Sequence, residues 1–333
     1  MKSFRNLFFS LLLCVVFLSQ SAFSKDLKVG IVFDKGGKDD KSFNAAAYQG
    51  ALKAKKEFGI KLKTVEATDD NALESLMRTF AKKKYDIIFG IGIAQVDAVK
   101  KTASKFPGLK FAIVDAEVDL PNVRSLLFEE HQGSYLVGAI AALKSKTGKL
   151  GFIGGMDIPL IRRFQLGFES GAKKINPKIK VVSNYIGVTG SAWNNPPKAK
   201  ELAVSQFNEG ADVVFAAAGA SNLGLFDAAE ELNKYAIGVD SNQNWIKPGR
   251  ILTSMLKRVD IAVFSTIEDM RNSKFSQGVK RYGLSNDGVG FSIDQFNKGL
   301  LSEDILVQVN KLKSNIEQGS IRVPDYYVEN AKK

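Results

Sequence analysis

The sequence predicts an α/β protein made of two similar lobes. Short apolar runs typical of buried strands alternate with longer segments of helical periodicity along nearly the whole chain. About eleven such strands occur, and the strand–helix cycle restarts near the middle of the chain. Strands that alternate with helices in this way form parallel sheets with right-handed crossovers. No Gly/Ser-rich linker separates the halves, so we expect short, rigid crossings and a hinged cleft between the lobes.

The first half alternates predicted strands and helices. Apolar residues recur three or four positions apart over 43–58, as on the buried face of a helix, and Gly59 suits its C-terminal end. The predicted strands are Leu27–Phe33, Ile60–Glu66, Tyr85–Gly90, Lys110–Val114 and Val123–Phe128. The predicted helices are Phe43–Phe58, Asn71–Lys83 and Ala94–Lys105.

The second half repeats this alternation. Pro196 suits the first turn of a helix, and Lys144–Lys149 is expected to be a surface loop within the second lobe. The predicted strands are Leu150–Ile153, Ile179–Ile186, Asp212–Ala218, Ala236–Val239, Ile251–Ser254 and Val289–Ser292. The predicted helices are Gly133–Lys144, a segment that ends near Ile175, Pro196–Glu209, Leu223–Asn233, Val259–Met270 and Glu303–Gln318.

Length and composition favour a soluble protein of two domains. The chain has 333 residues, of which 45% are hydrophobic and 25% charged, as in ordinary globular proteins. Its formal net charge is +12, but the lysines are spread along predicted helices, with only short runs such as Lys82–Lys84. We interpret them as solvated helix faces and expect no nucleic-acid partner.

The N-terminus has the pattern of a secretory signal peptide. Lys2 and Arg5 precede an apolar run over residues 7–18, and Ala22 and Ser24 supply small residues at the −3 and −1 positions of a cleavage site. A run of about 12 apolar residues is too short to span a bilayer comfortably. We therefore predict that residues 1–24 are a signal peptide cleaved after Ser24, and that the mature protein is periplasmic with a net charge of 12 − 2 = +10.

The only cysteine, Cys14, lies within this segment, so the mature chain contains no disulfide and depends on its core alone. A lipid anchor at Cys14 is the alternative hypothesis. Leu13 precedes Cys14 where a small residue is expected, and cleavage there would shorten the apolar run. A soluble periplasmic protein is therefore favoured.

Several classes of chemistry lack their motifs. The sequence contains no G-x-x-x-x-G-K-[ST] loop and no complete G-x-G-x-x-G fingerprint, and His131 is its only histidine. These absences argue against zinc sites built from His and Cys and against Ser-His-Asp or Cys-His catalysis, and we expect no cofactor or metal. His131 follows a predicted strand and is interpreted as a hinge or capping residue. A hydrolase with paired carboxylates stays possible, because several strands end in Asp.

The stretch Val29–Asn44 has the composition of a ligand-binding loop. A buried strand ends in Asp34, a Gly36-Gly37 pair follows, and Phe43 and Asn44 begin a helix. In open α/β sheets, ligands bind where such loops leave the carboxyl ends of the strands. A carboxylate, an aromatic ring and an amide suit a flat polar ligand. The alternative is an ordinary strand–helix turn with Ser42 as N-cap.

Acidic residues end further strands at corresponding positions. Asp34, Asp115 and Asp240 each follow an apolar strand directly. In a protein of two α/β lobes these carboxylates would converge on the cleft. An ionised carboxylate accepts more than one hydrogen bond, so it suits a vicinal diol or the polar edge of a base. The sequence therefore predicts a cleft for a polar ligand.

Six motifs, spread over 27–324, resemble those of the Bmp/PnrA-type basic membrane proteins, the substrate-binding components of nucleoside ABC importers. The motifs are DKGGKDDKSFNAAAYQG (34–50), GGMDIPLIRRFQLGFESGAK (154–173), YIGVTGSAWNNPPKAKELA (185–203), GADVVFAAAG (210–219), IGVDSNQ (237–243) and ILTSMLKRVD (251–260).

This resemblance implies a periplasmic-binding-protein type I fold, with two Rossmann-like lobes joined by a three-strand hinge and a ligand cleft between them. The N-terminal lobe would comprise residues 25–129 plus about 256–275, and the C-terminal lobe 130–255 plus about 276–333. The protein would not be an enzyme but a monomeric receptor. It would capture a purine nucleoside by hinge closure and deliver it to an ABC permease in the inner membrane.

The resemblance also implies roles for individual residues in the first lobe and the middle motif. Phe43 would stack on one face of the base, and Trp193, at a position that is often Phe in relatives, would stack on the other. Asp34, Asn44 and Asp115 would form hydrogen bonds with the edge of the base or with nearby polar atoms.

Three further positions complete the implied site. Asp240 would accept hydrogen bonds from the ribose hydroxyls, with Lys257 and the backbone of Gly219 beside it. Without the resemblance, Lys257 would be interpreted as a surface lysine. Asp40 lies in the first motif, where it would brace the loop.

Two departures from the family pattern weaken the prediction of the exact ligand. The loop after Gly219 is Ala220-Ser221-Asn222, which is poorer in glycine than in relatives, and Trp193 replaces the common Phe. Both change the shape of the cleft. The alternatives that we keep are a receptor of the same fold for a sugar or furanose signal, and a nucleoside hydrolase.

Overall fold

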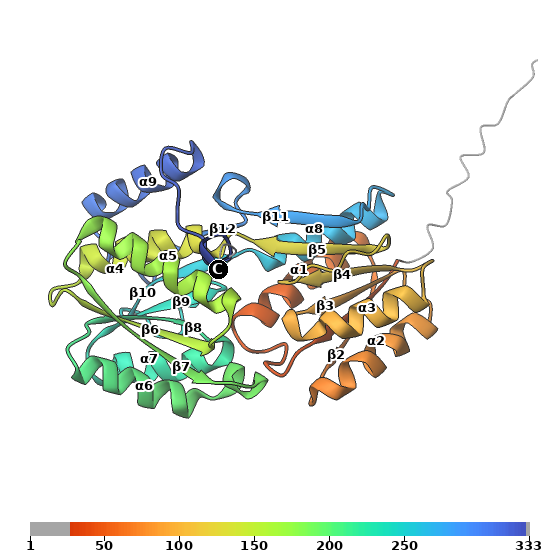
Figure 1. Cartoon of the computed structure of the whole chain (residues 1–333), viewed down its shortest axis with the longest axis horizontal. Coiled ribbons are helices and arrows are strands. Elements are labelled where there is room, and N and C mark those ends of the chain that lie inside the picture. The colour runs from red at the N-terminus through yellow and green to blue at the C-terminus, as the bar shows by residue number, and fades with distance from the viewer. Residues whose placement is uncertain (1–26, 331–333) are drawn as a thin grey trace, which may run out of the picture.

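The computed structural model describes residues 27–330, which fold into two lobes, each built on one six-stranded sheet (Figure 1). The sheet of the first lobe contains β1 (Lys28–Phe33), β2 (Lys61–Glu66), β3 (Ile87–Ile91), β4 (Lys110–Val114), β5 (Val123–Phe128) and β11 (Gly278–Tyr282). The sheet of the second lobe contains β6 (Lys149–Met156), β7 (Lys180–Gly187), β8 (Val213–Ala217), β9 (Tyr235–Asp240), β10 (Ile251–Lys257) and β12 (Val289–Phe291).

The two sheets have the same strand topology. The order is β11-β5-β4-β3-β1-β2 in the first lobe and β12-β10-β9-β8-β6-β7 in the second. The strands pair in parallel, except that β12 runs antiparallel to β10. The carboxyl ends of the parallel strands in each sheet therefore lie at one edge, where strand–helix loops can form a site. The predicted α/β fold of two similar lobes is confirmed.

Helices cover both sheets. The first lobe carries α1 (Phe43–Phe58), α2 (Leu73–Lys82), α3 (Val96–Lys105) and α8 (Val259–Arg271), the last packed on α1. The second lobe carries α4 (Glu130–Lys144), α5 (Pro159–Ile175), α6 (Pro196–Asn208), α7 (Asn222–Glu231), α9 (Glu303–Glu317) and the short α10 (Tyr326–Asn330). None of the helices among the described residues is long and apolar enough to cross a membrane.

The apolar strands are buried on both faces. In β1, Ile31 and Phe33 pack into one core cluster and Val32 into another, on the opposite face of the sheet. Strands covered in this way are nearly continuous apolar runs rather than alternating ones. This property explains why the sequence revealed them so clearly.

The chain crosses between the lobes three times. It passes from β5 to α4, from β10 to α8, and from β11 to β12. The expectation that residues beyond about 276 lie entirely in the second lobe is wrong, because β11 pairs with β5 of the first sheet. This strand is an edge strand whose residues are mostly exposed, so it has no apolar run that could reveal it in the sequence. The predicted signal peptide and Cys14 lie outside the described residues.

The start of α1 differs from the sequence interpretation. Ser42 occupies the N-cap position, but its side chain makes no capping hydrogen bond. The buried Asp40 carboxylate caps the helix instead. It accepts hydrogen bonds from the backbone N–H groups of Ser42 (2.8 Å), Asn44 (2.9 Å) and Ala45 (2.9 Å). Asp40 therefore braces the loop, and the hydroxyl of Ser42 is free for another role.

The cap gives a prediction about stability. Replacing Asp40 by Ala leaves three N–H groups at the start of α1 without their acceptor, so the free energy of unfolding should fall by about 1–2 kcal/mol in urea titrations. The control is Asp39→Ala, which removes an exposed neighbouring carboxylate. Equal stability of the two variants would contradict the capping role.

Candidate functional site

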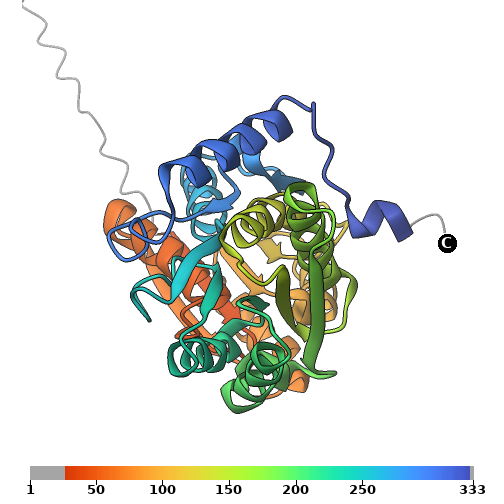
Figure 2. The ribbon, with the colours of Figure 1, turned by 90° about the vertical axis from the view of Figure 1, so that its left-hand side faces the viewer.

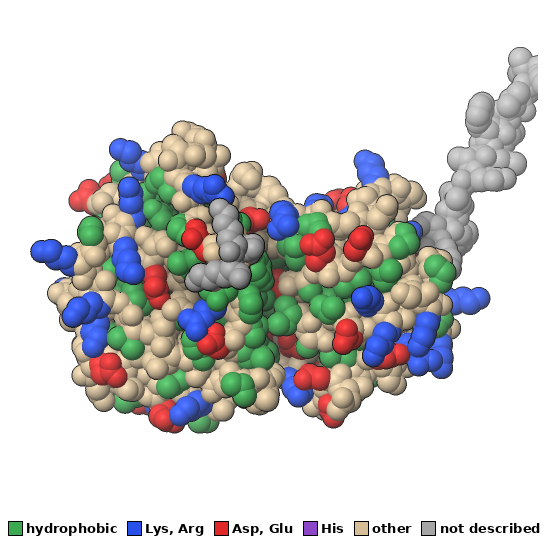
Figure 3. Space-filling view, in the orientation of Figure 1, with side chains coloured by type: hydrophobic (Ala, Val, Ile, Leu, Met, Phe, Trp, Pro, Cys, Tyr) green, Lys and Arg blue, Asp and Glu red, His purple; other side chains and the backbone are tan. Residues whose placement is uncertain are grey.

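A cavity lies between the two lobes at the carboxyl ends of the strands. Its empty space amounts to about 650 Å³, part of which is open to solvent. On the face shown in Figure 3, a furrow separates the lobes. All eight residues predicted as ligand contacts line this cavity: Asp34, Phe43, Asn44, Asp115, Trp193, Gly219, Asp240 and Lys257.

Both lobes contribute equally to this set. Asp34 and Asp115 follow β1 and β4, and Phe43 and Asn44 begin α1, so four residues come from the first lobe. In the second lobe, Asp240 and Lys257 end β9 and β10, Gly219 follows β8, and Trp193 lies in the short 3₁₀ helix Gly190–Asn194. The cavity is complete only when the lobes are together.

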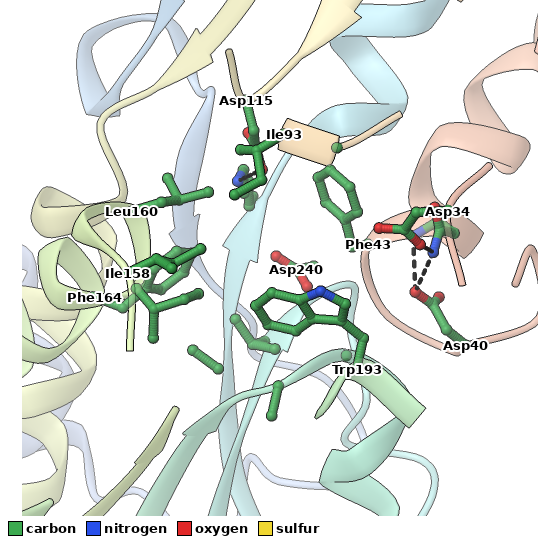
Figure 4. A pocket seen from close by; sticks show the side chains of 18 of the residues that line it. Asp34, Asp40, Phe43, Ile93, Asp115, Ile158, Leu160, Phe164, Trp193 and Asp240 are labelled. Carbon is green, nitrogen blue, oxygen red and sulfur yellow. Dashed lines mark hydrogen bonds and ion pairs between the residues drawn. The ribbon is translucent and has the colours of Figure 1, made fainter. Parts of the chain in front are cut away.

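Two aromatic rings point into the cavity from different lobes, Phe43 from the first and Trp193 from the second (Figure 4). The Trp193 ring lies against Gly155, where an added Cβ would be only 2.1 Å from ring atom Cζ3. Any side chain at this position would displace the ring. The glycine at the end of β6 is therefore required for the position of Trp193.

An apolar wall, which sequence reasoning missed, forms another side of the cavity. Ile158, Leu160, Ile161 and Phe164 come from the start of α5, and Ile93 comes from the loop after β3 (Figure 4). In the sequence these residues are indistinguishable from the core face of a helix. The motif 154–173 contained the four residues at the start of α5, but periodicity alone cannot distinguish a cavity wall from a core.

Asp34 and Asn44 form a polar cluster with Asp40. The amide nitrogen of Asn44 donates to Asp34 Oδ1 (2.9 Å) and to Asp40 Oδ2 (3.2 Å). Asp34 also accepts a hydrogen bond from the backbone N–H of Gly36 (2.9 Å). The side-chain oxygen of Asn44, Oδ1, is buried and has no partner, so it can accept a hydrogen bond from a ligand.

The two deep aspartates have unusual backbone conformations. Asp115 and Asp240 have φ angles of +72° and +63°, in the left-handed region that non-glycine residues seldom adopt. Asp tolerates this region better than most residues, but the conformation is still strained. Strain at two equivalent strand ends indicates that these carboxylates are held for a purpose other than stability.

Lys257 lines the cavity and is almost completely buried. Its Nζ is 2.6 Å from Asp115 Oδ2 and 3.1 Å from Glu130 Oε1. The rings of Phe43, Phe128 and Phe164 surround the ammonium at 5.1–5.5 Å from their centroids. Burial disfavours the charged form, but nearby carboxylates, those of Asp115, Glu130 and Asp240, outweigh this effect and hold the pKa of this lysine above its ordinary value.

Carboxylates outnumber cations in the cavity, because its lining contains four aspartates and one lysine. Burial raises the pKa of Asp240 and of Asp40 to about 6 and that of Asp115 to about 7. Asp115 Oδ1 is buried without a partner. A carboxyl group whose pKa is raised by folding stabilises the fold at low pH. This contribution is lost as the pH rises through the pKa that the group has in the folded protein. At neutral pH the ionisation of these buried carboxyl groups therefore opposes folding.

Hydrogen bonds also link the lobes beside the cavity. Ser42 Oγ donates to Asp240 Oδ2 (2.6 Å), Ser241 Oγ donates to the backbone carbonyl of Ser42 (2.8 Å), and Gln243 Nε2 donates to that of Lys41 (3.0 Å). These bonds join the start of α1 to the loop after β9, so the structure is in a closed arrangement. No local pattern in the sequence marks these pairs, because their partners lie about 200 positions apart.

His131 lies outside the cavity, at the crossing from β5 to α4. Glu129, His131 and Asp325 are the one group of possible metal ligands that lie close together among residues 27–330. However, Arg163 contacts all three, with Nη2 3.2 Å from Glu129, 3.0 Å from His131 Nδ1 and 2.9 Å from Asp325. A guanidinium in this position excludes a metal ion.

Comparison with known proteins identifies the family. A family model described as "Bmp: ABC transporter substrate-binding protein PnrA-like" matches residues 27–326. The chain belongs to this family. The family is one of substrate-binding proteins rather than enzymes, which agrees with the cavity described above.

Individual relatives of this Bmp-family protein cover nearly its whole length. A "CD4+ T-cell-stimulating antigen" of Listeria monocytogenes is 36% identical over 91% of this chain and 89% of its own. An "ABC transporter nucleoside-binding protein BmpA" of Lactococcus lactis is 33% identical over 90% of this chain and 89% of its own.

A solved structure confirms the fold of this Bmp-family protein. The ABC transporter solute-binding protein of Aeropyrum pernix superposes with a TM-score of 0.81 and 29% identity, over 89% of this chain and 93% of that chain. The predicted periplasmic-binding-protein type I fold is therefore confirmed, and the protein is an ABC transporter substrate-binding protein.

The contact between Gly155 and Trp193 can be tested by fluorescence. In a Trp245→Phe background, which leaves Trp193 as the sole tryptophan, Gly155→Ala should push the ring away from β6 and shift its emission. Gly108→Ala is the control, because an added Cβ there meets no atom within 4 Å. Identical spectra for the Gly155 variant and its parent would show that the ring is not held against this glycine.

Proposed function

We propose that the protein captures a purine nucleoside in the cavity between its lobes and delivers it to an ABC permease. The observation that carries this proposal is the combination of Phe43 and Trp193, which enter from opposite lobes, with carboxylates at the strand ends. A nucleoside has a base with two π faces and a sugar with vicinal hydroxyls. It therefore fits the two rings and the carboxylates better than a free base or a free sugar would.

In this proposal the base lies between the two rings. Stacking on an aromatic side chain contributes about 1–3 kcal/mol per base by analogy with nucleic-acid platforms. Asp34 and the free carbonyl of Asn44 face the edge of the base and accept hydrogen bonds from its N–H groups. The apolar wall from α5 favours a nucleoside over a free sugar, which has no apolar surface of comparable size to bury there.

The sugar lies deeper, at the strand ends of the second lobe. One oxygen of Asp240 accepts from Ser42, which leaves its second oxygen for a ribose hydroxyl. Asp115 Oδ1 is a further free acceptor, and the Lys257 ammonium lies beside it. A ligand without these hydroxyls would leave buried carboxylates unpaired, which explains how the site would select its ligand.

Closure of the lobes would commit the ligand to transport. Two hydrogen bonds, Ser42 with Asp240 and Gln243 with Lys41, form only when the lobes are in contact. A ligand that binds the closed arrangement more tightly than the open one therefore also stabilises these bonds. The closed form would then be the one that the permease recognises. We further propose that the signal peptide is cleaved after Ser24 and that the mature protein acts as a monomer in the periplasm.

The proposal predicts which substitutions abolish binding. Phe43→Ala removes a stacking ring and Asp240→Ala removes the acceptor for the sugar. Each should weaken purine-nucleoside binding tenfold or more, which corresponds to a loss of about 1.4 kcal/mol and lies within the range expected for such contacts. Isothermal titration calorimetry with inosine, guanosine and adenosine measures this effect. Circular dichroism confirms that each variant is folded.

Matched ligands make the same experiment selective. Free ribose should give no measurable heat, and free base should bind more weakly than the nucleoside. Release of free hypoxanthine from inosine would instead indicate a hydrolase. Unchanged nucleoside affinity in both variants, or binding of ribose as tight as that of inosine, would contradict the proposed site.

The pKa of Asp240 predicts how binding depends on pH. Ribose hydroxyls donate to the ionised carboxylate, whose pKa is about 6, so protonation of Asp240 alone should lower affinity by about tenfold between pH 7.5 and pH 5. Asp115, with its pKa near 7, would act in the same direction. Calorimetry across this range measures the change. In Asp240→Asn the contribution centred near pH 6 should vanish, and an identical pH profile in the variant would contradict this role.

A further inference from the structure

The C-terminal segment, residues 318–330, reaches back to the hinge. Figure 2 shows the chain leaving α9 and running along the edge of the molecule to α10. The segment is anchored by Val323, which is 5% exposed in the core, and α10 packs on α5. It therefore ends beside the helix whose first turns form the apolar wall of the cavity.

Asp325 of this segment holds the guanidinium of Arg163. Its two carboxylate oxygens accept from Nε (2.8 Å) and Nη2 (2.9 Å), a bidentate geometry that fixes the plane of the guanidinium. The ring of Tyr327 covers this plane, with its centroid 4.7 Å from Cζ. Burial works against ionisation of Asp325, but the contacts with Arg163 prevail and hold its pKa below the ordinary value.

The opposite side of Arg163 faces the hinge. Nη1 donates to the backbone carbonyl of Phe128 (2.6 Å) and to Glu130 Oε2, both at the crossing from β5 to α4. Glu130 is 1% exposed, and its second oxygen, Oε1, forms an ion pair with Lys257 Nζ at 3.1 Å. Lys257 in turn ends β10, immediately before the second crossing.

These contacts form one continuous series of alternating charges, Asp325–Arg163–Glu130–Lys257–Asp115. Three of its members, Arg163, Glu130 and Lys257, are almost fully buried, so each depends on its neighbours for compensation of its charge. The series begins on the C-terminal segment and ends on a carboxylate with a free oxygen in the ligand cavity. It also ties two of the three crossings together.

We propose that the C-terminal segment positions the Lys257 ammonium in the ligand cavity, acting through Arg163 and Glu130. Asp325 and Tyr327 keep the guanidinium oriented, so that one of its N–H groups holds Glu130. Glu130 then holds Lys257 against Asp115. Asp325, Arg163 and Glu130 are positioning residues that have no contact with the ligand itself. The consequence for affinity rests on the proposed function, but the position of the ammonium does not.

The direct test observes the ammonium in the full-length mature protein without ligand. Lysine labelled with ¹³C and ¹⁵N gives NMR signals of the NH₃⁺ groups, and the Lys257 signal is expected to be slowly exchanging and shifted by the three surrounding rings. Glu130 is a direct partner of the Lys257 ammonium, so Glu130→Gln should shift the Lys257 signal. This variant identifies the signal in the spectrum and shows how large a shift to expect.

Substitutions in the C-terminal segment are then compared with a matched control. Asp325→Asn should move or broaden the Lys257 signal, and the milder Tyr327→Leu should do so to a smaller extent. Glu329→Gln removes an exposed carboxylate from the same short helix and should leave the signal unchanged. If Asp325→Asn and Tyr327→Leu both leave the Lys257 signal in place while Glu130→Gln moves it, the proposal is wrong.

Calorimetry with inosine adds the functional outcome. Asp325→Asn should weaken binding between about two- and thirtyfold, the usual range for residues that act through others, while Glu329→Gln binds normally. If the Lys257 signal moves but the unaltered protein binds no nucleoside, the positioning role stands and the proposed ligand falls. If the signal moves and inosine affinity stays unchanged, the ammonium is not coupled to binding and the functional part of the proposal is overturned.

Discussion

The structure depends on one buried cation, the ammonium of Lys257. It lies at the end of β10 between Asp115 of the first lobe and Glu130 at the first crossing. A charge removed from water in this way is tolerated only when its partners are held in place, and breaking one contact leaves the others uncompensated. Because its partners come from both lobes, the same ion pair that compensates the charge also fixes the relation of the lobes around the cavity.

The cavity combines features that are unfavourable to the stability of the fold. Asp115 and Asp240 have strained backbone conformations, burial raises the pKa values of both carboxyls, and Asp115 Oδ1 and Asn44 Oδ1 lack partners. A ligand that supplies hydrogen-bond donors would compensate the buried carboxylates and the two oxygens without partners. Perturbed groups that gather at one cleft are characteristic of functional sites. The hydrogen bond between Ser42 and Asp240 then connects occupancy of the cavity with contact between the lobes.

The sequence predicted the fold well because its strands are buried on both faces, and it failed at β11, which is exposed. Asp34, Asp115 and Asp240 followed from their places at strand ends, whereas Lys257 and Trp193 depended on the family resemblance. The apolar wall looked like core. Long-range partners such as Ser42 with Ser241 and Arg163 with Asp325 could not be predicted, because no local pattern marks two polar residues that meet only after folding.

The most direct test of the central claim is a crystal structure of the protein with a purine nucleoside such as inosine. We expect the base between the rings of Phe43 and Trp193, its edge at Asp34 and Asn44, and at least one ribose hydroxyl within hydrogen-bonding distance of Asp240. A cavity that stays empty at saturating nucleoside, or a nucleoside bound elsewhere on the molecule, would contradict the account.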